Sequence, residues 1–176
     1  MVNLNAYHIV IPARFASKRL PGKVLLDIAG QPLLQHVWQR ANESAAESVV
    51  IATDDERIVT AAESFGAQVV LTRSDHPSGS DRIAECAAQL GWPDEYLLVN
   101  LQGDEPLMPA ACLDQVADLL IIRVDCDVAS LYWPMTNAEE INNPNAVKVV
   151  TDVDDHALYF SRAPIPYSRA HSDIDE

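Results

Sequence analysis

Basic residues are scarce in this chain. Its 176 residues include 12 Lys and Arg against 26 Asp and Glu, which gives a formal net charge of −14. Nonspecific binding to nucleic acid or to anionic membranes needs a net basic face. The charge balance argues against both kinds of partner, and we expect neither.

Cysteines and long apolar runs are also scarce. Cys86, Cys112 and Cys126 are odd in number, far apart in the sequence and not arranged as C-x-x-C, which is typical of reduced thiols in a cytosolic protein. The longest apolar runs are far too short to cross a bilayer. The N-terminal residues lack the cationic and apolar regions of a secretion signal. We therefore expect a cytoplasmic protein.

The composition is otherwise ordinary for a globular protein, with 48% apolar and 22% charged residues. A chain of this length can bury roughly 70% of its unfolded surface in one domain. We therefore expect a single domain over residues 1–176, with an α/β core over about 1–122 and a β-rich element over about 124–169.

Within residues 1–122, short apolar runs typical of strands alternate with helical patterns. We expect Thr53 to cap the second helix, and Gly66 and Gly91 to end the second and third. Such alternation predicts an α/β fold with a mostly parallel sheet and helices on both faces. The expected strands are 6–13, 47–53, 67–72 and 95–102, and the expected helices are 31–44, 53–66, 78–91 and 109–122.

The pattern changes after Ile122. Residues 126–135, 146–153 and 156–166 each resemble a strand, and only the short segment 137–142 between the first two looks helical. This change predicts the β-rich element.

A cluster of positive charge follows the first expected strand. Four of the twelve basic residues fall within ten consecutive positions, at Arg14, Lys18, Arg19 and Lys23. Residues 1–26 therefore carry +4 and the remaining 150 carry −18. In parallel α/β sheets, ligands bind beyond the carboxyl ends of the strands. The loop is therefore a candidate phosphate site.

The sequence of this loop is not that of a glycine-rich phosphate loop. Ser17 and Val24 stand where the P-loop pattern needs Gly and Ser or Thr, and the G-x-G-x-x-G pattern is absent. Side chains must then supply the charge, since Arg forks fit phosphate oxygens and Lys supplies a point charge. Pro21 and Gly22 predict a turn that aims Lys23 back at the ligand.

Polar residues also follow the fourth expected strand, in LVNLQGDEP. A carboxylate that faces a basic phosphate loop is what a Mg²⁺–triphosphate complex needs. Asp104 is the candidate metal ligand, whereas Glu105 is better interpreted as a structural partner in the loop.

Three further motifs allow both a structural and a functional interpretation. Ser78 and Gly79 of PSGSDR could donate hydrogen bonds to a base or a phosphate, or could simply cap a helix. ATDD at 52–55 is best explained as a cap. The D-C-D pattern of Asp125 and Asp127 matches the metal-binding pattern of many glycosyltransferases, but so short a pattern often arises by chance.

Six motifs, read in order, resemble the 3-deoxy-manno-octulosonate (Kdo) cytidylyltransferase family, the CMP-Kdo synthetases. They are IPARFASKRLPGK, ATDDERI, HPSGSDR, VNLQGDEP, NPNAVKVV and LYFSRAPIPY, in a match from about Tyr7 to Arg169. The resemblance implies a Rossmann-like three-layer α/β/α sandwich of the nucleotide-diphospho-sugar transferase type, which usually forms a homodimer through the β-rich element. It also implies that CTP and Kdo, a 2-keto sugar acid, give CMP-Kdo and pyrophosphate with Mg²⁺, for lipopolysaccharide biosynthesis.

The same resemblance implies roles for individual residues. Arg14, Arg19 and Lys23 correspond to triphosphate contacts, and Arg14, Lys23 and Asp104 to the catalytic groups, with Asp104 as metal ligand. Gln102 and Arg162 correspond to contacts with the sugar acid, since an Arg fork suits a carboxylate. The cytidine pocket corresponds to Pro12, Ala13, Ser78, Gly79 and Arg82.

The chain departs from the family pattern at Val24, at Ser80 and at its end. Members of the family continue beyond this length, through segments that supply more of the sugar pocket and a second metal carboxylate. We therefore expect the C-terminal part of the family fold to be absent from these 176 residues, and CTP binding to survive better than catalysis.

Three alternatives stay open at this point. The sugar could be an acylneuraminate or 8-amino-Kdo, because the phosphate loop does not select the sugar. The D-C-D pattern could belong to a metal-dependent glycosyltransferase. The chain could also be a catalytically silent module that only binds a nucleotide.

Overall fold

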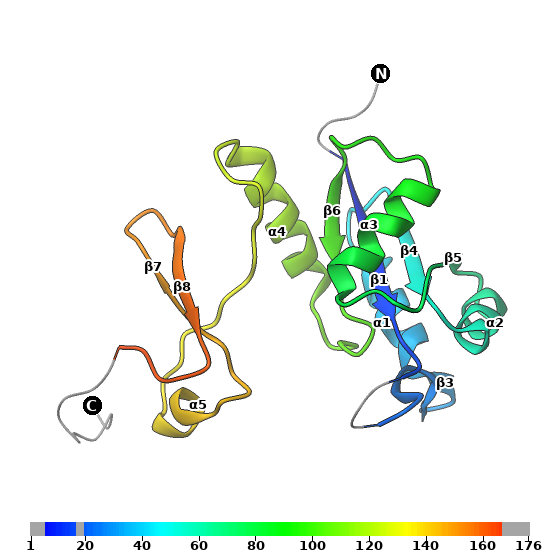
Figure 1. The fold of residues 1–176 in the computed structure, drawn as a ribbon, viewed down its shortest axis with the longest axis horizontal. Helices are drawn as coiled ribbons and strands as arrows, with labels where there is room; N and C mark the ends of the chain where they lie inside the picture. The colour runs from blue at the N-terminus through cyan, green and yellow to red at the C-terminus, as the bar shows by residue number, and fades with distance from the viewer. Residues whose placement is uncertain (1–5, 17–19, 167–176) are drawn as a thin grey trace. The chain divides into compact units, whose positions relative to one another are not determined.

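The computed structural model describes residues 6–16 and 20–166, which fall into two compact units that meet between Ala129 and Ser130 (Figure 1). Each unit is described by itself. Among the described residues, no helix has the length and apolar character needed to cross a membrane.

The first unit is built on a four-stranded parallel sheet with the strand order β5-β4-β1-β6. β1, one of the two inner strands, pairs on both sides, with Ile9 opposite Val49 and Val99, and is buried along its whole length. The prediction of a parallel sheet is confirmed. The strands are β1 (Tyr7–Ala13), β4 (Ser48–Thr53), β5 (Gln68–Leu71) and β6 (Leu97–Asn100).

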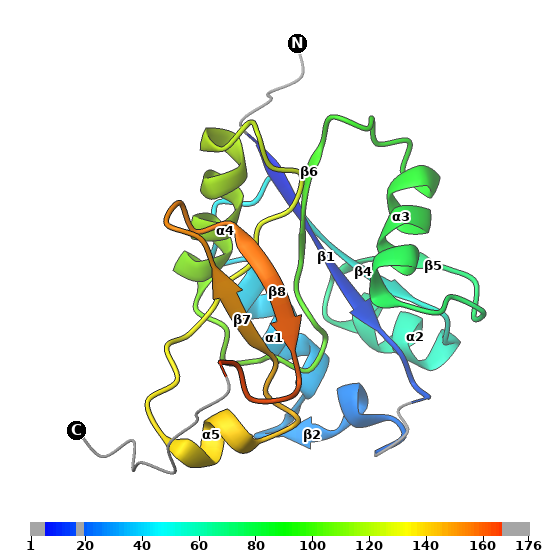
Figure 2. The same ribbon diagram turned by 60° about the vertical axis from the view of Figure 1, so that its left-hand side comes forward.

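Helices cover both faces of this sheet, as predicted. Ile9 and Ile11 of β1 pack in one apolar cluster with α1, α2 and α4, whereas Val10 packs in a second cluster with α3. Figure 2 shows α3 alongside β1 and β4. The alternation of β1 side chains between two faces therefore produces three layers. The helices are α1 (Leu33–Ala41), α2 (Glu56–Ser64), α3 (Gly79–Gln89) and α4 (Ala110–Ile122).

The expected cap of α2 was wrong. Thr53 is the last residue of β4, where it pairs with Ala13 and Leu71. The cap is Asp55, whose side chain accepts a hydrogen bond from the Arg57 backbone N–H at 3.0 Å. Before α1 lie three short elements that the sequence did not predict, η1 (Lys23–Leu25), β2 (Asp27–Ile28) and β3 (Gln31–Pro32).

The second unit contains α5 (Ala138–Asn142) and an antiparallel pair, β7 (Lys148–Thr151) and β8 (Ala157–Ser161). Asp152 organises the turn, since its Oδ1 accepts the backbone N–H groups of Asp154 and His156, both at 2.9 Å. The expected strand over 126–135 was wrong. Those residues form neither helix nor strand, and within the described part of the chain no strand pairs with their backbone.

His8 on β1 is a buried polar residue between two aromatic rings. Only 5% of it is exposed, and its ring stacks on Trp92 and Tyr96 at centroid distances of 4.7 and 4.6 Å. Its Nδ1 lies 2.8 Å from Ser48 Oγ. Burial lowers the pKa of His8 below its ordinary value of 6.5, although the charge of Glu47 acts in the opposite direction.

This lowered pKa predicts a loss of stability in mild acid. Below pH 6.5 the unfolded chain binds a proton at His8 that the folded chain does not bind, so the free energy of unfolding falls until the pH reaches the folded-state pKa. His8→Phe should reduce the dependence on pH of the urea-unfolding midpoint measured between pH 7 and pH 5. An equal slope in wild type and His8→Phe would contradict the assignment.

Candidate nucleotide-binding site

The predicted site residues of the first unit follow the carboxyl ends of its parallel strands. Arg14 follows β1, Ser78 and Gly79 lie at the start of α3 after β5, and Gln102 and Asp104 follow β6. This edge is where α/β sheets bind ligands. The chain therefore brings together, at one edge, residues up to 90 positions apart in the sequence.

The described part of the basic loop closes on itself. Gly22 donates its backbone N–H to the Phe15 carbonyl at 2.8 Å and has a φ of 71°, in the left-handed region that favours glycine. Lys23 follows directly and begins η1. The predicted turn at Pro21 and Gly22 is thus present, whereas Arg19 lies outside the described residues.

Lys23 and Asp104, predicted to bind phosphate and metal, are in contact. Lys23 Nζ donates to Asp104 Oδ2 at 2.9 Å, and the two side chains are 41% and 48% exposed. Glu105 lies next to this pair, and its pKa is raised by burial and by the charge of Asp104. The pair places a cation and a carboxylate of the predicted types within one hydrogen bond of each other.

Arg14 connects the end of β1 to the loop before α3. Its Nη2 donates to the His76 backbone carbonyl at 2.9 Å. The His76 ring in turn contacts Glu85 of α3, and this hydrogen bond lowers the pKa of Glu85. One end of the Arg14 guanidinium is therefore held by the loop that leads into α3 at Ser78 and Gly79.

Pro12, Gly79 and Gln102 meet where β1, α3 and the β6 loop approach one another. A Cβ added at Gly79 would lie 3.5 Å from Pro12 Cγ and 3.9 Å from Gln102 Nε2. The approach is closer still at the buried Gly103, where a Cβ would lie 3.1 Å from the Pro12 carbonyl oxygen and 3.5 Å from Ala13 Cβ. Glycine at 103 thus allows the Asp104 loop to lie directly against the end of β1.

Ser78 caps α3. Its Oγ accepts the Asp81 backbone N–H at 3.2 Å, while Asp81 Oδ2 accepts the Ser78 backbone N–H at 3.1 Å. The hydrogen bond from the Ser78 hydroxyl lowers the pKa of Asp81. This reciprocal arrangement is a capping box, so the structural interpretation of Ser78 is confirmed. Its contact with a nucleotide stays a prediction.

Arg82 is fully buried beneath the site. Its Nη2 lies 3.1 Å from Asp54 Oδ2, and its Nη1 donates to Thr72 Oγ1. Although Nη2 is within ion-pair distance of Asp54, neither Nε nor Nη2 makes a hydrogen bond within the described part of the chain. The sequence interpretation placed Arg82 in the cytidine pocket but missed Asp54, because it treated ATDD only as a helix cap.

Arg162 lies in the second unit, where its side chain contacts the segment that leads into β7. Its Nη1 donates to the Pro144 carbonyl at 2.9 Å. The buried Lys148 donates to the carbonyls of Asn143, Ala146 and Arg162 at 2.8 to 2.9 Å. Gln102, the other predicted sugar contact, belongs to the first unit and donates to Asn100 Oδ1 at 3.0 Å.

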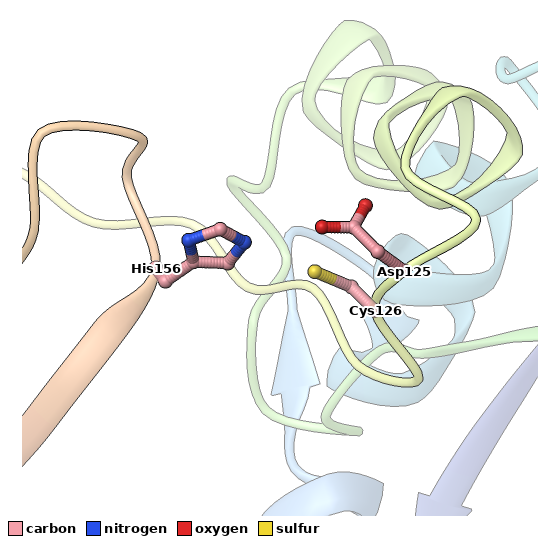
Figure 3. Close-up of side chains that lie close together, drawn as sticks. All are labelled: Asp125, Cys126 and His156. Atoms are coloured by element: carbon pink, nitrogen blue, oxygen red, sulfur yellow. The ribbon is translucent and has the colours of Figure 1, made fainter.

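The first carboxylate of the D-C-D tract forms a local ion pair. Arg123 donates from Nε and Nη2 to the two Asp125 oxygens, at 3.1 and 3.2 Å. Figure 3 shows Asp125 and Cys126 on the segment after α4 of the first unit, and His156 before β8 of the second. The pairing gives Asp125 a structural role at the end of α4.

Comparison with known proteins gives one consistent result. A family profile described as Cytidylyltransferase matches residues 8–174. A Thioalkalivibrio sulfidiphilus protein named 3-deoxy-manno-octulosonate cytidylyltransferase is 57% identical over 164 residues, covering 93% of this chain and 66% of the relative. The protein of that name from Francisella philomiragia is 53% identical over 173 residues, covering 98% and 68%. The chain thus spans about two thirds of the length of these curated relatives.

Solved structures agree with the sequence relatives. CMP:2-keto-3-deoxy-manno-octonic acid synthetase complexed with CTP superposes with a TM-score of 0.81 at 39% identity, covering 93% of this chain and 67% of that one. A cytidylyltransferase from Leptospira borgpetersenii gives a TM-score of 0.57 at 27% identity, covering 67% and 50%. The resemblance and the α/β fold that the six motifs predict are confirmed.

Proposed function

Because the chain belongs to the cytidylyltransferase family, we propose that it binds CTP at the carboxyl edge of its parallel sheet and couples CTP to Kdo, releasing pyrophosphate. The observation that carries the proposal is the meeting of the basic loop with the β6 loop, through Lys23 and Asp104 at 2.9 Å. The relatives named above supply the identity of the sugar acid. We also propose that the reaction serves lipopolysaccharide biosynthesis and takes place in the cytoplasm.

The proposed reaction is a displacement at phosphorus. The anomeric hydroxyl of Kdo forms a bond to the α-phosphorus of CTP, the bond from that phosphorus to the oxygen bridging the α- and β-phosphates breaks, that oxygen leaves with the pyrophosphate, and the hydroxyl proton leaves to solvent. Such a reaction is accelerated mainly by positioning and by stabilisation of phosphate charge. Arg14 and Lys23 are the residues proposed to bind and orient the phosphate oxygens.

Mg²⁺ fits the groups at this edge. Proteins usually hold Mg²⁺ through one or two carboxylates together with substrate phosphates and water. Asp104 would hold the ion, since its carboxylate is 48% exposed beside the basic loop. The ion would neutralise phosphate charge when bound. Lys23 would then exchange its contact with Asp104 for a phosphate oxygen.

The sugar site and the assembly complete the proposal. Gln102 and Arg162 are the proposed contacts to the sugar acid, because an exposed Arg fork suits a carboxylate. We also propose a homodimer formed through the second unit. Its strand β8 exposes three consecutive large apolar side chains, Leu158, Tyr159 and Phe160, at 66%, 61% and 59%.

Arg14→Ala should weaken CTP binding. A hydrogen bond to a charged group contributes about 1.5–3 kcal/mol, so we expect about a 10- to 150-fold higher Kd in calorimetric titration with Mg²⁺. The control is Arg40→Ala, which removes a half-buried arginine of α1 that pairs only with the nearby Glu43 among the described residues. Unchanged CTP affinity in Arg14→Ala would count against the phosphate role.

The activity itself is tested by pyrophosphate release from CTP and Mg²⁺, with and without Kdo, for this chain beside the full-length Thioalkalivibrio sulfidiphilus relative. Release that depends on Kdo supports the proposal. Release that responds to an acylneuraminate or to 8-amino-Kdo, but not to Kdo, would overturn the choice of sugar. CTP binding without release under any of these conditions would favour the silent binding module.

A further inference from the structure

Phe15 is the centre of the contacts that close the basic loop. Its carbonyl accepts the Gly22 N–H at 2.8 Å. Its ring lies against Gly22 so closely that an added Cβ there would be 3.0 Å from Phe15 Cε2. Arg14 precedes Phe15 and Lys23 follows Gly22, so this contact joins the two described cations of the loop through their immediate neighbours.

Arg57, on α2, lies over the same ring. Its guanidinium carbon lies 3.3 Å from the centroid of Phe15. This is well within the range of a cation–π contact, and a planar guanidinium stacks well on an aromatic face.

The orientation of the Arg57 side chain is fixed by Asp55, the residue that caps α2. Arg57 donates from Nε to Asp55 Oδ1 at 2.8 Å and from Nη2 to Asp55 Oδ2 at 2.6 Å. Asp55 also accepts the Arg57 backbone N–H, and hydrogen bonding to Arg57 lowers the pKa of Asp55. The fork of Arg57 is therefore engaged by a carboxylate, and its flat face is turned to Phe15.

We propose that Arg57 is a positioning residue for phosphate binding, which acts through Phe15 to hold Arg14 and Lys23 at the spacing that a triphosphate requires. The inference rests on the proposed CTP function. Binding groups held in place before the ligand arrives lose less entropy on binding, so a residue that only orders the loop changes affinity. Arg57 itself does not contact the nucleotide in this proposal, because Asp55 already engages its fork.

The test compares CTP with CMP. We expect Arg57→Ala to weaken CTP binding about two- to fivefold, the range of an exposed cation–π contact. CMP lacks the β- and γ-phosphates, so its affinity should change less and the ratio of CTP to CMP affinity should shrink. Arg57→Lys should recover part of the loss because it keeps the charge. Arg40→Ala is the matched control, and melting temperature is recorded for every variant.

A double-mutant cycle with Phe15→Leu isolates the contact. If Arg57 acts through the ring, the variant with both changes should bind CTP no more weakly than Phe15→Leu alone. Additive losses, unchanged CTP affinity in Arg57→Ala, or equal losses for CTP and CMP would each overturn the inference while leaving the proposed function intact. Failure of the wild-type chain to bind CTP would instead overturn the proposed function, and this inference with it.

Discussion

Asp104→Asn is expected to lower Kdo-dependent pyrophosphate release by about 10²- to 10³-fold, the usual loss when one group that stabilises transition-state charge is removed. The amide keeps the shape of the side chain but not the charge that would hold Mg²⁺. Initial rates measured over a range of Mg²⁺ concentrations check this expectation. Glu105→Gln is the matched control, since it removes the neighbouring carboxylate.

The contact between Lys23 and Asp104 gives this variant a second measurable effect. Asp104→Asn releases Lys23 from its 2.9 Å ion pair. CTP affinity without Mg²⁺ should therefore hold or rise, while the gain in affinity on adding Mg²⁺ should disappear. If Asp104→Asn still gained CTP affinity from Mg²⁺ as the wild type does, Asp104 would not be the metal ligand.

Arg82→Met is expected to lower the free energy of unfolding by about 3–5 kcal/mol, the cost of breaking a buried ion pair by removing one partner. Arg82 is 0% exposed, and its loss leaves Asp54, whose side chain is 15% exposed, without this cation. Methionine fills much of the same volume, so the loss of the charge and of the hydrogen bond to Thr72 is the main change. Urea unfolding followed by circular dichroism measures the effect.

The control for this variant is Arg40→Met on α1. Its partner is the exposed Glu43, and exposed pairs contribute about 0–1 kcal/mol. If the free energies of unfolding of Arg82→Met and Arg40→Met differed by less than 1 kcal/mol, the buried pair would not contribute substantially to the stability of this edge of the sheet.

The sequence predicted the sheet and its helices because their signals are local. Apolar runs such as Tyr7–Ala13, and glycines at helix ends such as Gly66, determine element type within a few residues. Thr53 was misassigned because capping depends on where the strand stops, which pairing with Ala13 and Leu71 decides. The expected strand over 126–135 failed for a related reason, since a strand needs a partner that a local pattern does not reveal.

The site was only partly predictable. Charge and position at strand ends were enough to single out Arg14, Lys23 and Asp104, and the structure brings the last two into contact. The contact of Phe15 with Arg57 and the pair of Asp54 with Arg82 were missed. Each joins a loop side chain to a helix side chain, 42 and 28 positions apart, and no spacing rule connects them.

Hydrogen exchange of the chain with and without CTP and Mg²⁺ tests the central claim most directly. Backbone amides in peptides that contain residues 12–15, 76–82 and 100–105 should exchange more slowly when CTP is bound, because these loops form the proposed site. Unchanged exchange in all three peptides, or slowing confined to the segment around Asp125 and Asp127, would contradict the account.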